Sequence, residues 1–251
     1  MSNKVMIVSG GASGLGLAAG VKFAKNGFNI VIIDIDQEKG VKAEEQIKSL
    51  GVDAVFCKCD ISKKEDVQKA AQVTKERFGR ADVLVNNAGL ELRGSILQCT
   101  EEEWTRLYDI NLKGIFYMTN AFAPYMIEQG GGAIVNTGSI LGFRSVPERA
   151  AYSSSKGAIA TLTRSMAFDL AEKNIRVNCV APGAIDTPLI RGSINDSPNP
   201  EETERILGSN SVFNRMGTPE EVANVMYFLG SDEASFVTGA TYFVDGGWSI
   251  L

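Results

Sequence analysis

Short apolar runs alternate with longer amphipathic stretches along the whole chain. The runs are rich in Val, Ile, Leu and Ala, which predicts strands at Lys4–Ser9, Asn29–Asp34, Ala54–Cys59, Val83–Asn86, Ala133–Thr137, Arg176–Val180 and Thr241–Val244. Between them, apolar positions recur at helical spacing, which predicts helices at Gly14–Lys25, Gln37–Leu50, Lys63–Phe78, Glu101–Glu128, Ala151–Lys173 and Pro219–Leu229. Alternating strands and helices indicate the α/β class.

The near-continuous apolar strands indicate how the sheet is covered. Strands of a parallel sheet are buried on both faces, so they do not alternate between apolar and polar positions. We therefore expect a single doubly wound α/β domain over residues 1–251, with a seven-stranded parallel sheet and helices on both faces. One segment, about 187–218, breaks the pattern because it is polar and contains Pro188, Pro198 and Pro200. Long irregular segments are often lids, so we expect a substrate lid there.

Composition and charge exclude several classes of function. The net charge is −5 and no block of like charge occurs, so the clustered Lys and Arg of a nucleic-acid-binding surface are missing. No apolar run approaches the roughly 20 residues of a membrane helix. The run Val5–Val8 is too short for a signal peptide. We expect a cytoplasmic protein that binds neither nucleic acid nor membrane.

The chain contains no histidine, which restricts its chemistry. Ser-His-Asp and Cys-His catalysis and His-ligated metals are excluded. Cys57 and Cys59 flank Lys58 in an expected strand, and no second cysteine pair has zinc spacing, so no metal site is expected. Proton transfer must therefore use Tyr, Lys, Asp, Glu or Cys.

A glycine-rich loop joins the first strand to the first helix. Glycines let backbone N–H groups approach a pyrophosphate closely, and the N-terminus of the following helix favours negative charge. By itself the loop also fits an ordinary glycine-rich turn. The residues that would bind the cofactor here are Gly10, Ser13, Gly14, Leu15 and Gly16.

Asp34 ends the second strand, 18 residues after Gly16. A carboxylate at this place can accept hydrogen bonds from the adenosine ribose hydroxyls and would repel a 2′-phosphate. The next residues, Ile35 and Asp36, offer no positive charge for such a phosphate. The sequence therefore predicts NAD rather than NADP. The alternative is that Asp34 only caps the following helix.

Two further groups follow the third and fourth strands. Asp60, followed by Ile61, is placed to bind the adenine amino group, or to cap a turn near Ser62. Asn87, Ala88 and Gly89 belong to an Asn-Asn-Ala-Gly run that also fits a turn. All these residues follow consecutive strands at their carboxyl ends, where open α/β sheets bind ligands.

Tyr152 and Lys156 open a helix at positions i and i+4, so they share one face. A free phenol has a pKa of about 10, which a nearby ammonium and a positive nicotinamide ring would lower. A lowering by about three units needs about 4 kcal/mol. Tyr152 would then act as a base toward an alcohol. In isolation the pair also fits a chance arrangement on an amphipathic helix.

Two more polar residues accompany this pair. Ser139 ends the fifth strand, where its hydroxyl can bind a substrate oxygen. Asn111 lies inside a helical stretch although Asn has poor helix propensity, which indicates a bent helix or a water site.

Taken together, the motifs closely resemble the short-chain dehydrogenase/reductase family over nearly the whole chain. The family's glycine motif matches residues 9–16, with Ser9 replacing Thr and keeping the hydroxyl. Its Asn-Asn-Ala-Gly matches residues 86–89 and its Pro-Gly-x-x-x-Thr matches residues 182–187. Its Asn-Ser-Tyr-Lys tetrad falls on Asn111, Ser139, Tyr152 and Lys156. The resemblance implies a Rossmann fold.

The resemblance also implies roles. Tyr152 is the acid/base, Ser139 orients the substrate oxygen, and Asn111 holds a water that relays the proton. Lys156 binds the nicotinamide ribose and lowers the tyrosine pKa. Hydride transfer is expected at the B face of the nicotinamide ring. The family's tetramers imply a homotetramer formed through the two long helices and the C-terminal strand. Cofactor contacts are expected from Pro182, Gly183, Ile185 and Thr187, the last two at the carboxamide.

These observations predict an NAD-dependent oxidoreductase that interconverts a secondary alcohol and a ketone. One alternative is a 3-oxoacyl thioester reductase, whose usual NADPH preference Asp34 opposes. Another is a non-catalytic NAD-binding sensor, although such relatives tend to lose the tyrosine or the lysine.

Two arginines bear on the substrate. Arg149 precedes Tyr152 by three residues, and Arg191 lies in the polar lid segment. Arginine binds carboxylates in bidentate pairs, so we expect a small polar substrate: a hydroxy acid or sugar acid, with a neutral sugar next. The alternatives are that both arginines are solvated surface groups, or that Arg149 pairs with Glu148 or Asp186.

Overall fold

The computed structural model describes residues 4–251. Seven strands form one parallel sheet in the order β3-β2-β1-β4-β5-β6-β7, which confirms the predicted fold class. The order reverses between β1 and β4, which creates the crevice where open α/β sheets bind ligands. The strands are β1 (Val5–Ser9), β2 (Asn29–Asp34), β3 (Ala54–Lys58), β4 (Val83–Asn86), β5 (Gly132–Thr137), β6 (Ile175–Pro182) and β7 (Thr241–Val244).

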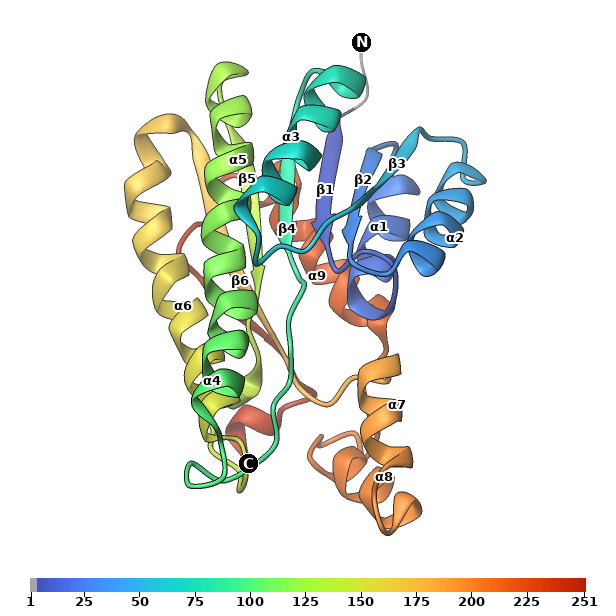
Figure 1. Cartoon of the computed structure of the whole chain (residues 1–251), viewed down its shortest axis with the longest axis vertical. Helices are drawn as coiled ribbons and strands as arrows, with labels where there is room; N and C mark the ends of the chain where they lie inside the picture. The colour runs from blue at the N-terminus through green and yellow to red at the C-terminus, as the bar shows by residue number, and fades with distance from the viewer. Residues whose placement is uncertain (1–3) are drawn as a thin grey trace.

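Helices cover both faces of the sheet (Figure 1). One layer contains α1 (Gly14–Ala24), α2 (Gln37–Lys48) and α9 (Pro219–Gly230), and the other contains α3 (Lys64–Phe78), α5 (Gly114–Glu128) and α6 (Ala150–Leu170). Successive strand residues point to opposite faces. Accordingly, Val5 and Ile7 of β1 join one core, whereas Met6 and Val8 join the other. This double burial explains the near-continuous apolar strands.

The long helix predicted over Glu101–Glu128 is interrupted. It consists of α4 (Glu101–Tyr108), a π-helical turn (Asp109–Lys113) and α5. Asn111 lies at the centre of the π turn and is buried, so the helical pattern is interrupted at this residue. Single π turns inside α-helices often occur at functional sites.

The segment predicted as a lid contains two short helices beyond the carboxyl edge of the sheet (Figure 1). They are α7 (Pro188–Asn195) and α8 (Pro200–Ser209). Each begins with proline at its first position, after a capping residue, Thr187 or Asn199. Proline suits that position because its missing N–H would have no helical partner there.

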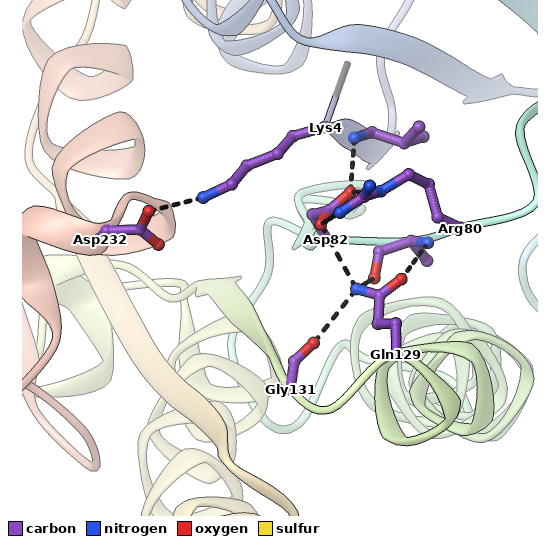
Figure 2. Close-up of polar contacts among 8 residues, drawn as sticks. Lys4, Arg80, Asp82, Gln129, Gly131 and Asp232 are labelled. Carbon is purple, nitrogen blue, oxygen red and sulfur yellow. Dashed lines mark hydrogen bonds and ion pairs between the residues drawn. The ribbon is translucent and has the colours of Figure 1, made fainter. Parts of the chain in front are cut away.

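Asp82 links several segments at the amino edge of the sheet, which is opposite the carboxyl edge (Figure 2). Its carboxylate accepts hydrogen bonds from the Val5 amide at 2.7 Å, from the Arg80 guanidinium and from the Gln129 side chain. Nearby, Lys4 forms an ion pair with Asp232 at 2.7 Å. These contacts join segments at the start of β1, before β4 and after α5.

Among residues 4–251, no helix has the length and apolar character needed to cross a membrane.

Candidate active site

The glycine loop has a backbone that side chains would disturb. Gly10 and Gly14 have φ values of 64° and 53°, in the left-handed region that favours glycine. A Cβ on Gly16 would lie 2.1 Å from the Gly10 carbonyl oxygen. Ser13, the N-cap residue of α1, makes no side-chain cap hydrogen bond. The helix N-terminus is therefore available to an anionic group, as a pyrophosphate site requires.

Asn87 locks this loop to the turn after β4. Its Nδ2 donates to the carbonyl oxygens of Ser9 at 3.2 Å and Gly10 at 3.3 Å. In return, Ser9 Oγ accepts hydrogen bonds from the amides of Asn87 and Ala88. The Ser9 hydroxyl thus performs a structural task that the family's threonine hydroxyl could also perform. The two predicted cofactor segments are one connected unit.

Asp34 also contacts the glycine loop. Its Oδ2 accepts a hydrogen bond from the Ala12 amide at 3.0 Å, and its Oδ1 accepts one from the Asp36 amide. The cap of α2 is Asp36, whose side chain accepts from the Lys39 amide. The alternative that Asp34 only caps the helix is therefore wrong. Ile35 is 65% exposed beside it.

Asp60 and Ile61, the two residues predicted to bind the cofactor after β3, both contact other parts of the protein. Asp60 Oδ1 accepts hydrogen bonds from the Ser62 amide at 3.0 Å and the Ser62 hydroxyl at 2.7 Å. It therefore caps this turn, while Lys63 is the N-cap residue of α3. Ile61 is buried in the core against Gly114, so its side chain does not face solvent.

The segment after β6 reaches the glycine loop as well. Pro182 ends β6, and the next residue, Gly183, lies so close to Asp245 that a Cβ would be 2.8 Å from the Asp245 Cα. A Cβ on Gly14 would lie 3.7 Å from Thr187 Cβ, in ordinary van der Waals contact. Ile185 is buried, and Thr187 accepts a hydrogen bond from the Ile190 amide as the cap of α7. The predicted carboxamide contacts thus adjoin the predicted pyrophosphate loop.

Lys156, Asn111 and Tyr152 meet beside Gly89. A Cβ on Gly89 would lie 3.3 Å from both Lys156 Nζ and Asn111 Oδ1. Lys156 is 5% exposed, its Nζ donates to the Thr137 carbonyl oxygen at 3.0 Å, and this nitrogen lies 5.8 Å from the centre of the Tyr152 ring. The helical spacing predicted this shared face correctly.

Ser139 completes this set at the end of β5. Its Oγ accepts a hydrogen bond from the Leu141 amide, and the Ser139 hydroxyl acts to lower the pKa of the Tyr152 phenol. The structure therefore brings all four residues of the predicted tetrad to the carboxyl edge of the sheet.

Asn111 acts as a clamp on the loop after β4. Its Oδ1 accepts from the Leu90 amide at 2.8 Å, and its Nδ2 donates to the Leu90 carbonyl oxygen at 3.1 Å and to Ser155 Oγ at 3.0 Å. The side-chain amide is thus fully engaged with protein atoms. Its role in holding a relay water stays a prediction.

The charges around Tyr152 and Lys156 act in opposite directions. Burial raises the pKa of Tyr152 to about 12, with a further rise from Glu91, while the Ser139 hydrogen bond and Arg149 oppose this rise. Burial lowers the pKa of Lys156 to about 8. The protein by itself therefore favours the protonated phenol. The lowered tyrosine pKa expected from Lys156 does not arise from the fold alone, because desolvation of the phenolate dominates.

The two arginines chosen from the sequence are paired with carboxylates of the chain. Arg149 Nε donates to Glu91 Oε1 at 3.1 Å, and Arg191 forms ion pairs with Asp186 and Glu204, both at 2.6 Å. Arg149, whose side chain is 14% exposed, is not a solvated surface group, and its partner is neither the Glu148 carboxylate nor Asp186; Arg191 is exposed and forms its ion pairs at the surface. Among the described residues, no group of three or more His, Cys, Asp or Glu side chains is arranged to hold a metal.

Sequence reasoning missed Glu91. This residue comes two positions after the Asn-Asn-Ala-Gly run, and its side chain is only 14% exposed. The available signal was a carboxylate directly behind a strand-end motif, where polar groups tend to face the ligand.

The glycine loop lies beside the carboxylate of Asp34, and Tyr152 and the buried Lys156 lie at the same edge of the sheet. This combination is typical of a dinucleotide-dependent oxidoreductase. A family profile described as "Enoyl-(Acyl carrier protein) reductase" matches residues 10–249. An "Uncharacterized oxidoreductase" of Thermotoga maritima is 41% identical over 97% of this chain and 96% of its own length. The "3-oxoacyl-[acyl-carrier-protein] reductase FabG" of the same organism is 36% identical, covering 98% of each chain. The protein belongs to the short-chain dehydrogenase/reductase family.

Solved structures of this family closely match the fold. Levodione reductase superposes with a TM-score of 0.95 at 32% identity, covering 100% of this chain and 99% of that chain. NAD⁺-bound xylitol dehydrogenase gives 0.93 at 32% identity, covering 98% and 99%. L-sorbose reductase from Gluconobacter frateurii, complexed with NADPH and L-sorbose, gives 0.94 at 30% identity, covering 98% and 97%. All three of these related proteins are named as oxidoreductases, and their family acts on CH–OH groups.

Proposed function

We propose that the protein is an NAD-dependent dehydrogenase that interconverts a secondary alcohol and a ketone. The observation that carries this proposal is the convergence of Ser139, Tyr152 and Lys156 at the sheet edge that also holds the glycine loop. Both Tyr152 and Lys156 are present, which disfavours a non-catalytic NAD-binding sensor.

Each side chain has a task that follows from its surroundings. A bound nicotinamide cofactor would supply the hydride acceptor or donor and, when oxidised, a positive charge. Ser139 Oγ lies beside the phenol and is placed to orient the substrate oxygen. Tyr152 donates its proton to the carbonyl oxygen in reduction and accepts it in oxidation. Lys156, anchored to the Thr137 carbonyl oxygen, holds an ammonium near the phenol. Because the protein raises the tyrosine pKa, alcohol oxidation should accelerate as the pH rises.

Asp34 is the basis for proposing NAD rather than NADP. Its carboxylate is fixed against the glycine loop by the Ala12 amide, so a 2′-phosphate there would meet negative charge. The side chain of Ile35, which follows, brings no compensating cation. Xylitol dehydrogenase was solved with NAD⁺ and L-sorbose reductase with NADPH, so relatives use both cofactors.

For the substrate, we propose a small polar molecule. The segment 187–218, with α7 and α8, would be its lid. Arg149 and Arg191 are each paired within the chain, which favours a neutral hydroxylated substrate over a hydroxy acid or sugar acid. Xylitol dehydrogenase and L-sorbose reductase are named after neutral polyhydroxylated compounds. A 3-oxoacyl thioester reductase is the second candidate, on the strength of the FabG relative.

The test is a turnover screen. Polyols, sugars, hydroxy acids and a 3-hydroxyacyl thioester are offered with saturating NAD⁺ or NADP⁺, and formation of reduced cofactor is followed by absorbance. We expect oxidation of neutral polyols with NAD⁺, and loss of turnover in Tyr152→Phe with NADH binding retained. Binding of NADH without turnover of any compound would instead support the sensor, and a Tyr152→Phe variant with near-normal kcat would refute the mechanism.

We also propose a homotetramer. Large apolar side chains stand exposed on the elements expected to form the contacts: Phe116 on α5 is 57% exposed, Phe168 on α6 is 86% exposed and Ile250 near the C-terminus is 84% exposed. Where such side chains adjoin one another in a patch, they are typical of surfaces that an assembly covers.

A further inference from the structure

Two adjacent serines, Ser154 and Ser155, lie between Tyr152 and Lys156 in the first turns of α6. Ser154 is exposed, whereas Ser155 is completely buried at 0% exposure. A buried hydroxyl is unfavourable unless hydrogen bonds compensate for the water that it loses. The partners of Ser155 therefore indicate what this hydroxyl does between the tyrosine and the lysine.

Ser155 contacts two members of the tetrad. Its Oγ donates to the Tyr152 carbonyl oxygen at 2.8 Å, a bond that serines commonly form within a helix. A hydroxyl has a single proton, so this oxygen can otherwise only accept hydrogen bonds. It accepts one from Asn111 Nδ2 at 3.0 Å, and both side chains are buried. Ser155 therefore joins α6 to the π turn that carries Asn111.

Asn111 extends this contact to the loop after β4. Its Oδ1 accepts from the Leu90 amide at 2.8 Å, and its Nδ2 donates to the Leu90 carbonyl oxygen at 3.1 Å. Nδ2 has two protons, so Leu90 and Ser155 together use its whole donor capacity. Leu90 follows Gly89. Because a Cβ on Gly89 would lie 3.3 Å from both Asn111 Oδ1 and Lys156 Nζ, this loop lies directly beside the ammonium.

Removal of the Ser155 hydroxyl would leave one N–H of Asn111 buried without its acceptor. An unpaired buried donor is unfavourable, so the side-chain amide would move toward another acceptor or toward water. Either movement weakens its bonds to the Leu90 backbone. Displacements of about 1 Å between reacting groups are enough to slow an enzyme by up to about 100-fold.

We propose that Ser155 is a positioning residue of the active site. Its hydroxyl fixes the Asn111 side chain relative to α6, and thereby fixes the loop beside Lys156. The inference rests on the proposed function, because it assigns Ser155 to the alignment of the same tetrad. Ser155 transfers no proton, since its own proton is donated to the Tyr152 carbonyl oxygen. It acts through Asn111.

The experiment compares Ser155→Ala with Ser154→Ala, which is a closely matched control. Ser154 Oγ also donates to a carbonyl oxygen three residues earlier, that of Ala151, at 2.8 Å. It also accepts from a side chain, the Tyr108 hydroxyl, at 2.9 Å. Each variant therefore loses one bond within α6 and one bond to residues 101–113. Only Ser155→Ala loses the contact with Asn111.

The first measurement is amide hydrogen exchange of the protein without substrate, followed by mass spectrometry with single-residue fragmentation. It is read at the Leu90 amide, which donates to Asn111 Oδ1. Exchange at this amide should be about 3- to 10-fold faster in Ser155→Ala, because the loss of one hydrogen bond loosens Asn111. Ser154→Ala should keep the exchange of the unmodified protein. This readout is independent of the substrate.

The second measurement is oxidation with NAD⁺ of the alcohol that the unmodified protein turns over fastest among the screened polyols, sugars, hydroxy acids and thioester. In Ser155→Ala, kcat should fall about 3- to 10-fold, while KM for NAD⁺ changes less than about 2-fold because the glycine loop is untouched. Ser154→Ala should keep both constants. A purely structural role would lower the urea midpoint of both variants and leave kcat unchanged.

A double variant tests whether Ser155 acts through Asn111. Two residues that act through one contact are not additive, so adding Ser155→Ala to Asn111→Ala should lower kcat by less than about 2-fold. Equal exchange at Leu90 in the two serine variants, or a fully additive loss of kcat, would overturn the role of Ser155 and leave the dehydrogenase proposal intact. An unmodified protein that oxidises none of the screened alcohols would overturn the proposed function, and this inference with it.

Discussion

Replacing Lys156 by methionine should abolish turnover yet leave the fold at least as stable near neutral pH. Lys156 is buried, and burial lowers its pKa from 10.5 to about 8. Below about pH 8 the folded protein carries a buried ammonium whose cost, taken from that difference, is about 3 kcal/mol. Methionine has a similar length and no charge. It loses the hydrogen bond to the Thr137 carbonyl oxygen, which costs about 1–3 kcal/mol. The net expectation is a change between about zero and 2 kcal/mol in favour of Lys156→Met.

The difference in stability between the unmodified protein and Lys156→Met should depend on pH. Between about pH 8 and pH 10.5 the unfolded lysine is protonated while the folded one is not, so the unmodified protein gains stability as the pH rises. Its stability relative to Lys156→Met should therefore improve by about 2 kcal/mol between about pH 7 and pH 9.5. Urea unfolding of both proteins at the two pH values measures this change.

An exposed lysine gives the control. Lys173 ends the turn after α6 and is exposed, so Lys173→Met should show no comparable pH-dependent difference. If Lys156→Met is less stable than the unmodified protein by more than about 1 kcal/mol at pH 7, the buried lysine is better solvated than its surroundings indicate, and the reasoning fails.

Three other predictions concern cofactor, stability and assembly. Asp34→Ala combined with Ile35→Arg should shift the NAD⁺-to-NADP⁺ ratio of kcat/KM toward NADP⁺ by about 10- to 150-fold, and equal use of both cofactors by the unmodified protein would contradict the role of Asp34. Asp82→Asn should lower the free energy of unfolding by about 2–4 kcal/mol while kcat stays constant, because its partners lie at the edge opposite the site; a changed kcat with unaltered urea unfolding would contradict this. Light scattering at micromolar concentration should give four times the chain mass of 27.0 kDa, and a monomer would exclude the tetramer.

The sequence alone determined the fold class and most of the candidate site. Strand and helix periodicity is local, so the bounds of β2 and β4 were predicted to the residue. The glycine loop and the Tyr152–Lys156 spacing are also local, because both depend on backbone geometry within a few residues. Even the interruption of the helix at Asn111 was indicated by an asparagine inside a helical pattern. The family resemblance depends on these local features and on no long-range contact.

Only the tertiary structure decided which charges neutralise one another and how burial shifts proton affinities. Arg149 pairs with Glu91, which is 58 residues away in the chain. The sequence around either residue did not indicate this pairing. The pKa of Tyr152 rises although a lysine shares its helix face, since desolvation depends on every element packed around the phenol. Ion pairing and desolvation act through space between segments that the fold brings together, whereas periodicity and spacing act along the chain. For that reason the sequence predicted the residues of the site, and the structure determined its electrostatics.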